Sequence, residues 1–237
     1  MRQHDQEPAP SSPDQHRVPA WRRHTEGETI VGCCLAVITV SILHWFLNDG
    51  LSLGPRWLMP AVSAVLLVVL ISLHPHRMHQ QSMSARVVGL VMLAVLAFAN
   101  VTAGVRLVSQ ILGRKVGSSD PLHLIMSGAS IWIANVIIFG LLYWAFDRGG
   151  PASRALGLRQ YTDFQFPQMA DPSSAPPDWE PTLLDYLYLA FTNATAFSPT
   201  DVMPLTRPAK MTMMVQSTLS VVLIALVVAR AVNVLAT

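Results

Sequence analysis

The sequence predicts an all-α integral membrane protein. Of its 237 residues, 51% are hydrophobic and 13% are charged, and the hydrophobic residues occur in long blocks. Five blocks are long enough for a helix that crosses a bilayer, which needs about 20 residues, whereas a sixth block of roughly 14 residues is too short. We therefore expect five transmembrane helices and one re-entrant segment between the last two. The five blocks are residues 29–47, 57–73, 87–112, 122–146 and 211–235.

The N-terminal part of the chain is expected to contain a tail and a three-helix membrane region. Residues 1–28 are polar and rich in proline, which predicts a disordered tail. Residues 29–112 hold the first three blocks, whose short connections predict antiparallel neighbours. Cys33 and Cys34 lie inside the first block, where two adjacent thiols offer neither a disulfide framework nor a zinc site.

Residues 113–237 are expected to form a channel-like module. A helix is followed by a long polar connection, whose prolines and central apolar stretch predict an ordered cap. The half-length segment and a final apolar helix complete the module. Its expected parts are helix 122–146, cap loop 147–181, pore helix 182–196, filter-like loop 196–204 and helix 209–236.

The Lys and Arg residues outside the blocks predict the orientation in the membrane. Eleven lie on the side that holds the N-terminus, the second loop and the long fourth loop, and three lie on the opposite side. The first side is expected to be cytoplasmic, which places the re-entrant segment there and the C-terminus outside. If the short segment instead crosses completely, Arg207 and Lys210 change sides and the count becomes nine against five, with both termini inside.

A pore-like signature lies near the C-terminus: Tyr188-Leu-Ala-Phe-Thr-Asn-Ala-Thr195, then Asp201-Val-Met-Pro204 and an apolar helix. It resembles the pore region of the potassium-channel superfamily, in which a short helix ending in Thr-Thr leads into Val-Gly-Tyr-Gly-Asp, an apolar pair and Pro. The resemblance implies a homotetramer whose loops surround a common axis. The filter-like positions are Thr195, Ala196, Phe197, Ser198, Pro199, Thr200 and Asp201.

The filter-like positions differ from the family pattern. The family filter uses two glycines to turn successive carbonyl groups toward the ion, and Ser198 and Thr200 take their places here. Pro199 lacks an N–H and fixes its own φ. The sequence therefore predicts a degenerate filter without potassium selectivity, with Asn193 and Thr195 holding the loop by hydrogen bonds.

The chain is also similar to an uncharacterised family of bacterial membrane proteins with several spans. This likeness rests on Asp147-Arg-Gly-Gly-Pro151, Phe164-Gln-Phe-Pro-Gln-Met169 and Ala196-Phe-Ser-Pro-Thr-Asp201. It implies the architecture and a location in the bacterial cytoplasmic (inner) membrane. It brings no activity with it.

Four polar residues are candidates for contact with a pore. Thr212, Gln216 and Ser220 share one face of the last helix, where they either line water or bond to neighbouring helices. Asp201 either contributes to a ring of negative charge that attracts cations at the pore mouth or caps its own turn.

The third block contains two further polar candidates, Asn100 and Arg106. A cation inside a membrane is a functional candidate by default. The expected partner of Arg106 is the Asp147 region, Asp120 or a lipid phosphate, and such a pair is either functional or purely structural.

No enzymatic motif is present, so we expect neither catalysis nor a cofactor. His74, His76 and His79 lie within one turn, but no nearby carboxylate or thiol completes a metal site, and a solvated turn is the expected structure. A net charge of +2 does not indicate a nucleic-acid partner.

These patterns predict a homotetrameric channel-like protein among membrane lipids that conducts monovalent cations with little selectivity. The alternative is a nonconducting membrane scaffold or ligand-binding protein. In that case Phe197 and Pro199 seal a channel-like frame.

Overall fold

The computed structural model describes residues 19–47, 50–52, 54–55, 57–73, 83–113, 121–195 and 201–235. It is predominantly helical, which confirms the all-α prediction. A shorter helix, α7 (Leu183–Thr195), precedes the last long helix. The long helices are α1 (Val31–Trp45), α2 (Leu58–Leu73), α3 (Met83–Gly113), α4 (Pro121–Phe146) and α8 (Arg207–Leu235).

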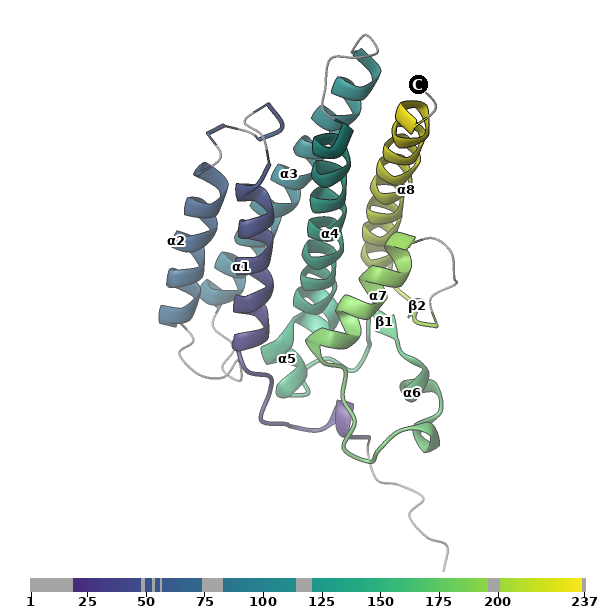
Figure 1. The fold of residues 1–237 in the computed structure, drawn as a ribbon. Coiled ribbons are helices and arrows are strands. Elements are labelled where there is room, and N and C mark those ends of the chain that lie inside the picture. Colours follow the sequence, from purple (N-terminus) through teal and green to yellow (C-terminus); the bar gives the residue numbers. More distant parts are fainter. Residues whose placement is uncertain are drawn as a thin grey trace, which may run out of the picture.

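The helix α4 lies at the centre of the bundle. It packs against α1, α3, α7 and α8, whereas α2 packs against α1 and α3. The long helices lie side by side along a shared axis, and α7 crosses obliquely between α4 and α8 (Figure 1). Most of the apolar window of α4 is buried, 61%, compared with 22% for α8. The helix α8 therefore presents most of its surface to the surroundings of a single chain.

Two glycines of α4 set the distances to its neighbours in the module. At Gly140 an added Cβ would lie 2.7 Å from Leu187 Cδ2 and 3.1 Å from Leu187 Cα on α7. At Gly128 it would lie 2.5 Å from Val227 Cγ2 on α8. Real side chains do not approach so closely, so a larger residue at Gly140 would displace the α7 backbone.

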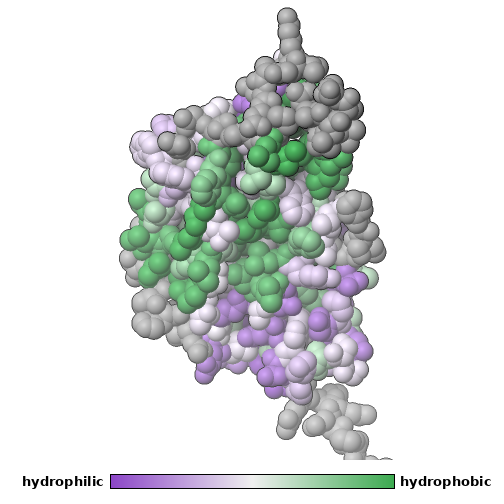
Figure 2. All heavy atoms as spheres, viewed as in Figure 1, coloured by the Kyte–Doolittle hydropathy of each residue, from purple (hydrophilic) through white to green (hydrophobic). Residues whose placement is uncertain are grey.

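A folded connection between α4 and α7 caps one end of the bundle. It contains η2 (Asp147–Gly149), α5 (Pro151–Ala155), β1 (Phe164–Gln165), α6 (Pro167–Ala170) and η3 (Pro172–Ser174). The strand β1 pairs antiparallel with β2 (Met203–Pro204), which precedes α8. Hydrophilic side chains gather at this end of the molecule, and hydrophobic side chains form a band along the helices (Figure 2).

Residues 19–28 pack against the cap, which corrects the prediction of a disordered tail for this part of residues 1–28. The short helix η1 (Ala20–Arg22) buries Trp21, whose carbonyl oxygen accepts a hydrogen bond from Arg148 Nη1. Glu28 accepts a hydrogen bond of 2.8 Å from Trp144 Nε1. These individual contacts order the segment although its average composition is polar.

Three helices within the described residues are long and apolar enough to cross a membrane: α3, α4 and α8. Three such helices are compatible with the predicted insertion into a membrane. In contrast, α1 has 15 residues and α2 has 16. At about 1.5 Å per residue, each of these two helices is shorter than the ~30 Å hydrocarbon core.

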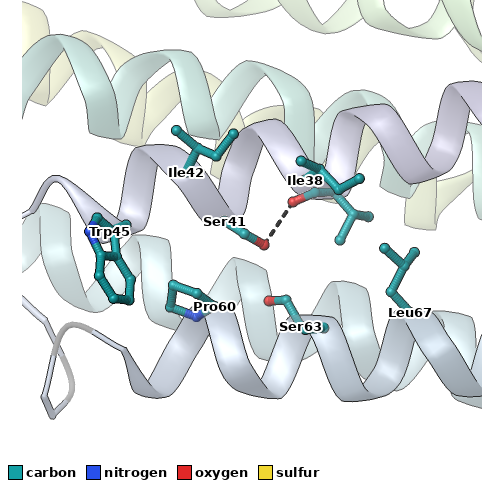
Figure 3. A pocket seen from close by; sticks show the side chains of 9 residues that line it. Ile38, Ser41, Ile42, Trp45, Pro60, Ser63 and Leu67 are labelled. Carbon is teal, nitrogen blue, oxygen red and sulfur yellow. Dashed lines mark hydrogen bonds between the residues drawn. The ribbon is translucent and has the colours of Figure 1, made fainter.

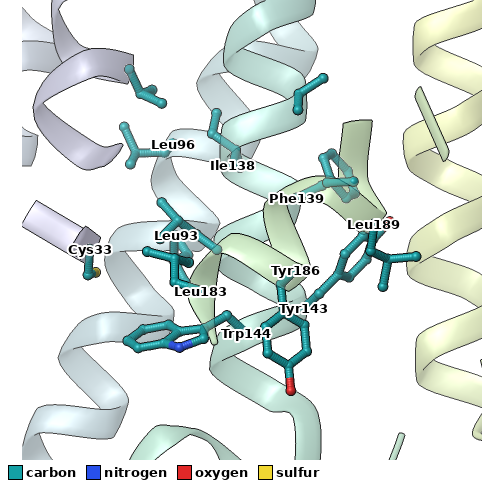
Figure 4. Packing of buried hydrophobic residues seen from close by; sticks show 14 of the residues in the cluster. Cys33, Leu93, Leu96, Ile138, Phe139, Tyr143, Trp144, Leu183, Tyr186 and Leu189 are labelled. Carbon is teal, nitrogen blue, oxygen red and sulfur yellow. The ribbon is translucent and has the colours of Figure 1, made fainter. Parts of the chain in front are cut away.

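The larger of two apolar clusters lies toward the cap. Figure 4 shows that its side chains converge from α1, α3, α4 and α7, among them Cys33, Leu93, Ile138 and Leu183. A smaller cluster lies farther from the cap and includes Leu107, Leu124, Ile131 and Leu223. The helix α7 therefore belongs to the core rather than to a peripheral loop.

Candidate functional site

The candidate site is the segment 183–204, which enters the bundle and returns to the same end. The helix α7 begins at the cap and is directed into the bundle beside α8 (Figure 1). The chain is back at the cap at β2, where Pro204 lies opposite Phe164 and Met203 opposite Gln165. The turn between them, 196–200, lies outside the described residues.

The start of α7 is fixed by two carboxylates. The backbone N–H and the hydroxyl of Thr182 both donate to Asp185 Oδ2, at 2.7 and 2.8 Å. Leu183 N donates to Glu28 Oε2 at 3.2 Å. Negative charge is favourable at a helix N-terminus because the backbone N–H groups there have no partner within the helix.

Glu28 also joins three parts of the chain. Its Oε2 accepts from Trp144 at the end of α4 as well as from the start of α7. Burial raises the pKa of Glu28, and the positive charge of Arg154 opposes this rise in part. The N-terminal segment thereby contacts the end of α4 and the start of α7 through one partly desolvated carboxylate.

The carboxylate of Asp147 is fully buried and has four hydrogen-bond donors. Tyr186 OH donates to Oδ2 at 2.6 Å. Oδ1 accepts from Asp163 N at 2.7 Å, Thr162 Oγ1 at 3.0 Å and Phe164 N at 3.3 Å. Asp147 therefore connects the end of α4 with β1 and α7.

The residues after Asp147 reverse the chain sharply. Arg148 has φ 52°, Gly149 has φ 84° and Gly150 has φ 97°. A Cβ at Gly150 would lie 2.7 Å from Ala145 O. Glycine is therefore required at 150 both for its φ and for the close approach of the backbone. The Asp-Arg-Gly-Gly sequence is accounted for by this reversal.

Two buried arginines bond to backbone carbonyls in the same region. Arg148 Nε and Nη2 donate to Arg159 O at 3.1 and 3.0 Å. Arg154 Nη1 donates to Trp144 O at 2.6 Å, and its guanidinium carbon lies 5.1 Å from the centre of the Tyr186 ring. The positive charges are thus held by the backbone and by aromatic faces.

Asp163 anchors the return of the chain. Its Oδ1 accepts from Thr206 Oγ1 at 2.7 Å, and its Oδ2 accepts from Arg148 N at 3.0 Å. Leu205 N donates to Asp163 O at 2.8 Å. We call Glu28, Asp147, Arg148, Arg154, Asp163 and Tyr186 the cap cluster.

A second polar group joins the inner half of α7 to α8 and α4. Gln216 Oε1 accepts from Asn193 Nδ2 at 2.8 Å and from Tyr143 OH, and Gln216 Nε2 donates to Ala190 O at 2.8 Å. Asn135 Nδ2 donates to Ser220 Oγ at 2.7 Å. We call Asn135, Tyr143, Asn193, Gln216 and Ser220 the interior amide cluster.

This arrangement decides between the two interpretations of the polar stripe on α8. Gln216 and Ser220 are both 0% exposed and bond to α4 or α7 within one chain. They therefore serve as interhelical contacts, which corrects their assignment as pore-lining candidates. The hydroxyl of Thr212 donates to Pro208 O at 2.8 Å within its own helix.

Of the seven filter-like positions, only Thr195 and Asp201 lie within the described residues. Thr195 ends α7 and its hydroxyl donates to Thr192 O at 2.9 Å. Asp201 is exposed and begins the return to β2. Ala196, Phe197, Ser198, Pro199 and Thr200 lie outside the described residues.

The two polar residues of α3 have different surroundings. Arg106 Nη1 donates to Ser52 O in the connection between α1 and α2. Of the three partners considered for Arg106, the Asp147 carboxylate is instead held in the cap by four other donors, and Asp120 lies outside the described residues. Asn100 is 1% exposed, and neither of its side-chain polar atoms has a hydrogen-bond partner among the described residues.

The sequence analysis did not identify Glu28, Tyr143 or Tyr186 as important polar contacts. An acidic residue directly before an apolar block was a usable signal for Glu28. Tyrosines in apolar helices often need a partner for the hydroxyl, which was a signal for the other two. Their partners, however, lie far away in sequence and are set by the packing of α4 against α7.

Comparison with known proteins adds no further constraint. No family model, curated protein or solved structure matches the chain. Among the described residues, no group of three or more His, Cys, Asp or Glu side chains is placed to hold a metal ion. The geometry of α4, α7 and α8 therefore carries the functional argument.

Proposed function

We propose that the protein is a channel-like membrane protein with a homotetrameric cation pore that lacks a potassium-selective filter. The observation that carries the proposal is the path of segment 183–204. A half-length helix enters between two helices long enough to cross a membrane, and the chain returns to the end from which it entered. In the membrane this path is a re-entrant pore loop.

The direction of α7 supports a preference for cations. Its N-terminus lies at the cap and its C-terminus is directed into the bundle. The C-terminal end of a helix carries partial negative charge from unpaired carbonyl groups, which stabilises a cation nearby. The helix is also held at both ends, by the cap cluster and by the interior amide cluster.

The loop after α7 supplies the expected selectivity. Asp201 is exposed at the cap end, where four copies around an axis would form a ring of negative charge. Ser198 and Thr200 replace the glycines that a carbonyl filter requires, so we expect conduction of monovalent cations with little selectivity. Phe197 or Pro199 would form the narrow point.

Exposed apolar surface supports assembly around an axis. One stripe of α7 exposes Leu184 by 73%, Tyr188 by 59% and Phe191 by 48%. Along α8, Met211, Met214 and Val215 are each more than half exposed. One loop cannot enclose a pore alone, and these surfaces offer neighbouring subunits an apolar contact.

Other apolar surfaces are suited to lipid. A recess of about 220 Å³ lies between α1 and α2 and includes Ile38, Trp45 and Leu67 (Figure 3). The hydroxyl groups of Ser41 and Ser63 in its wall donate to carbonyls of their own helices, at 2.8 and 2.9 Å. The recess thus offers no free hydroxyl hydrogen and is suited to a lipid acyl chain.

We place five spans in the bacterial cytoplasmic membrane, with α1 and α2 spanning through locally thinner bilayer or with the help of flanking residues. The excess of Lys and Arg on the side of the cap places the cap in the cytoplasm. The C-terminus would then lie outside.

A nonconducting scaffold or ligand-binding protein is the second candidate. It is favoured by the burial of Gln216 and Ser220, because the polar face of α8 is used inside the chain and the outward face is apolar. In this case Phe197 and Pro199 close the frame.

Flux measurements on the full-length protein in liposomes test the proposal. Potassium, sodium and chloride fluxes would be compared for the native chain, Asp201→Lys and Phe197→Ala. Asp178→Lys is the matched control, since Asp178 is an exposed cap carboxylate outside the loop. We expect cation flux that Asp201→Lys reduces, Phe197→Ala increases and Asp178→Lys leaves unchanged.

The absence of flux from folded, oligomeric protein would reject the pore and favour the sealed frame. Flux that responds equally to Asp201→Lys and Asp178→Lys would reject the placement of Asp201 at the pore mouth. Unchanged flux in Phe197→Ala would reject the narrow point at this residue.

A further inference from the structure

A layer of buried polar residues separates the two apolar clusters of the core. On each of four helices, the buried apolar residues one to two turns toward the cap from the polar residue belong to the larger cluster. Those one to two turns in the opposite direction belong to the smaller cluster. The residues of this polar layer are His44 on α1, Asn100 on α3, Asn135 on α4 and Ser220 on α8.

Asn100 and Asn135 lie at the same level of two facing helices. At Gly104 on α3, an added Cβ would lie 3.8 Å from Ile131 Cγ2 on α4, which aligns these two positions. The helices are antiparallel, so one turn toward the cap leads from Gly104 to Asn100 and from Ile131 to Asn135. The two amides therefore belong to one region of the α3–α4 interface.

Several polar atoms of this layer have no hydrogen-bond partner among the described residues. They are Asn100 Nδ2, Asn100 Oδ1, Asn135 Oδ1 and His44 Nε2. Asn135 uses its Nδ2 on Ser220 Oγ at 2.7 Å, and His44 Nδ1 lies 2.9 Å from Val40 O. A carbonyl oxygen requires a hydrogen on Nδ1, which leaves Nε2 as an acceptor.

The hydrogen-bonding roles of these four unpartnered atoms indicate what kind of ligand could bind them. Three are acceptors and one is an NH₂ donor, and none belongs to a charged side chain that would recruit an ion. A ligand must donate to at least two acceptors and accept from an amide. Water does both, and buried waters typically make about three hydrogen bonds to such groups.

We propose that the polar layer binds ordered water molecules between α1, α3 and α4, inside the apolar core. The bound water satisfies amide and imidazole groups that would otherwise be desolvated without a partner. It also makes the contact between the three-helix region and the channel-like module partly polar. This inference is independent of conduction through the loop 196–204.

Radiolytic hydroxyl-radical labelling of the full-length protein in lipid nanodiscs tests the proposal. Radicals formed from a bound water oxidise the side chains that it contacts. We expect oxidation of His44 although it is only 6% exposed. Met92 is the matched control, because it is 1% exposed within the larger apolar cluster and methionine is the more reactive side chain. Protection of His44 equal to that of Met92 would overturn the proposal.

Two controls identify the origin of the label on His44. A scavenger in bulk solvent should suppress oxidation of Tyr161, which is 83% exposed, and leave His44 labelled. Loss of both labels together would overturn the proposal. In Asn100→Val and Asn135→Val we expect weaker His44 labelling, provided that each variant keeps the native melting transition. Unchanged labelling in both folded variants would also reject a shared layer of water.

Discussion

The cap cluster and the interior amide cluster hold opposite halves of the same helix with different chemistry. At the cap, the carboxylates of Glu28 and Asp147 contact the start of α7 and Tyr186. In the interior, Asn193 and Gln216 hold the end of α7 with neutral amides. Ionised groups are costly at membrane depth, whereas amides are tolerated when they bond to neighbouring helices. Carboxylates thus hold the start of α7 at the cap, and neutral amides hold its end inside the bundle.

Asp147→Ala should have the largest effect on stability. The substitution leaves the Tyr186 hydroxyl and the backbone N–H groups of Asp163 and Phe164 without their acceptor. Leaving several buried donors without an acceptor should cost about 3–5 kcal/mol in total. Thermal unfolding in detergent measures the change, with Asp178→Ala as an exposed control. Equal shifts in the two variants would contradict the central role of Asp147.

Gln216→Leu should have the second largest effect, about 2–3 kcal/mol. It removes the acceptor of Tyr143 and Asn193 and the donor to Ala190 O. In thermal unfolding, the double variant with Asn193→Leu should lose less stability than the sum of the two single variants, because both residues share one hydrogen bond. Strict additivity would show that the amides do not act together.

The smallest expected effect is on the pH dependence of stability, which should differ between the cap cluster and the interior amide cluster. Burial raises the pKa of Glu28, so its ionised form is less stable in the folded protein than in the unfolded chain. The contribution of this group to stability therefore increases as pH falls from the raised folded pKa to the ordinary value near 4.5.

Glu28→Gln should remove this part of the pH dependence of the melting temperature. Gln216→Leu should leave it in place, because the interior amide cluster contains no group that titrates in this range. An identical pH dependence in the native protein and in Glu28→Gln would contradict the assignment to Glu28.

In the interior amide cluster, the sequence predicted which residues form hydrogen bonds more readily than it predicted their partners. Asn193 was expected to hold the loop that follows α7 by hydrogen bonds, and among the described residues it bonds to α4 and α8. The partners themselves, Gln216 and Tyr143, depend on how α7 lies against α4 and α8. For Gln216 the helical spacing predicted a shared face, but not whether that face is turned to water or to protein.

Local sequence patterns predicted the helical fold and the approximate extents of the helices, including three that are long and apolar enough to cross a membrane. The length and polarity of a hydrophobic block are local properties of the sequence. They were sufficient to predict the helices α3, α4 and α8 and the shorter helix α7. The spacing of Gln216 and Ser220 also predicted that they share one face of the last helix.

The contacts of these elements, in contrast, could be identified only from the folded structure. It ordered residues 19–28 against the cap, placed Asp147 between β1 and Tyr186, and turned Gln216 and Ser220 into the protein. Each outcome depends on residues that are distant in sequence and on close approaches such as that of α4 and α7 at Gly140. Burial and hydrogen-bond partners are properties of packed surfaces, and no local pattern of the chain contains them.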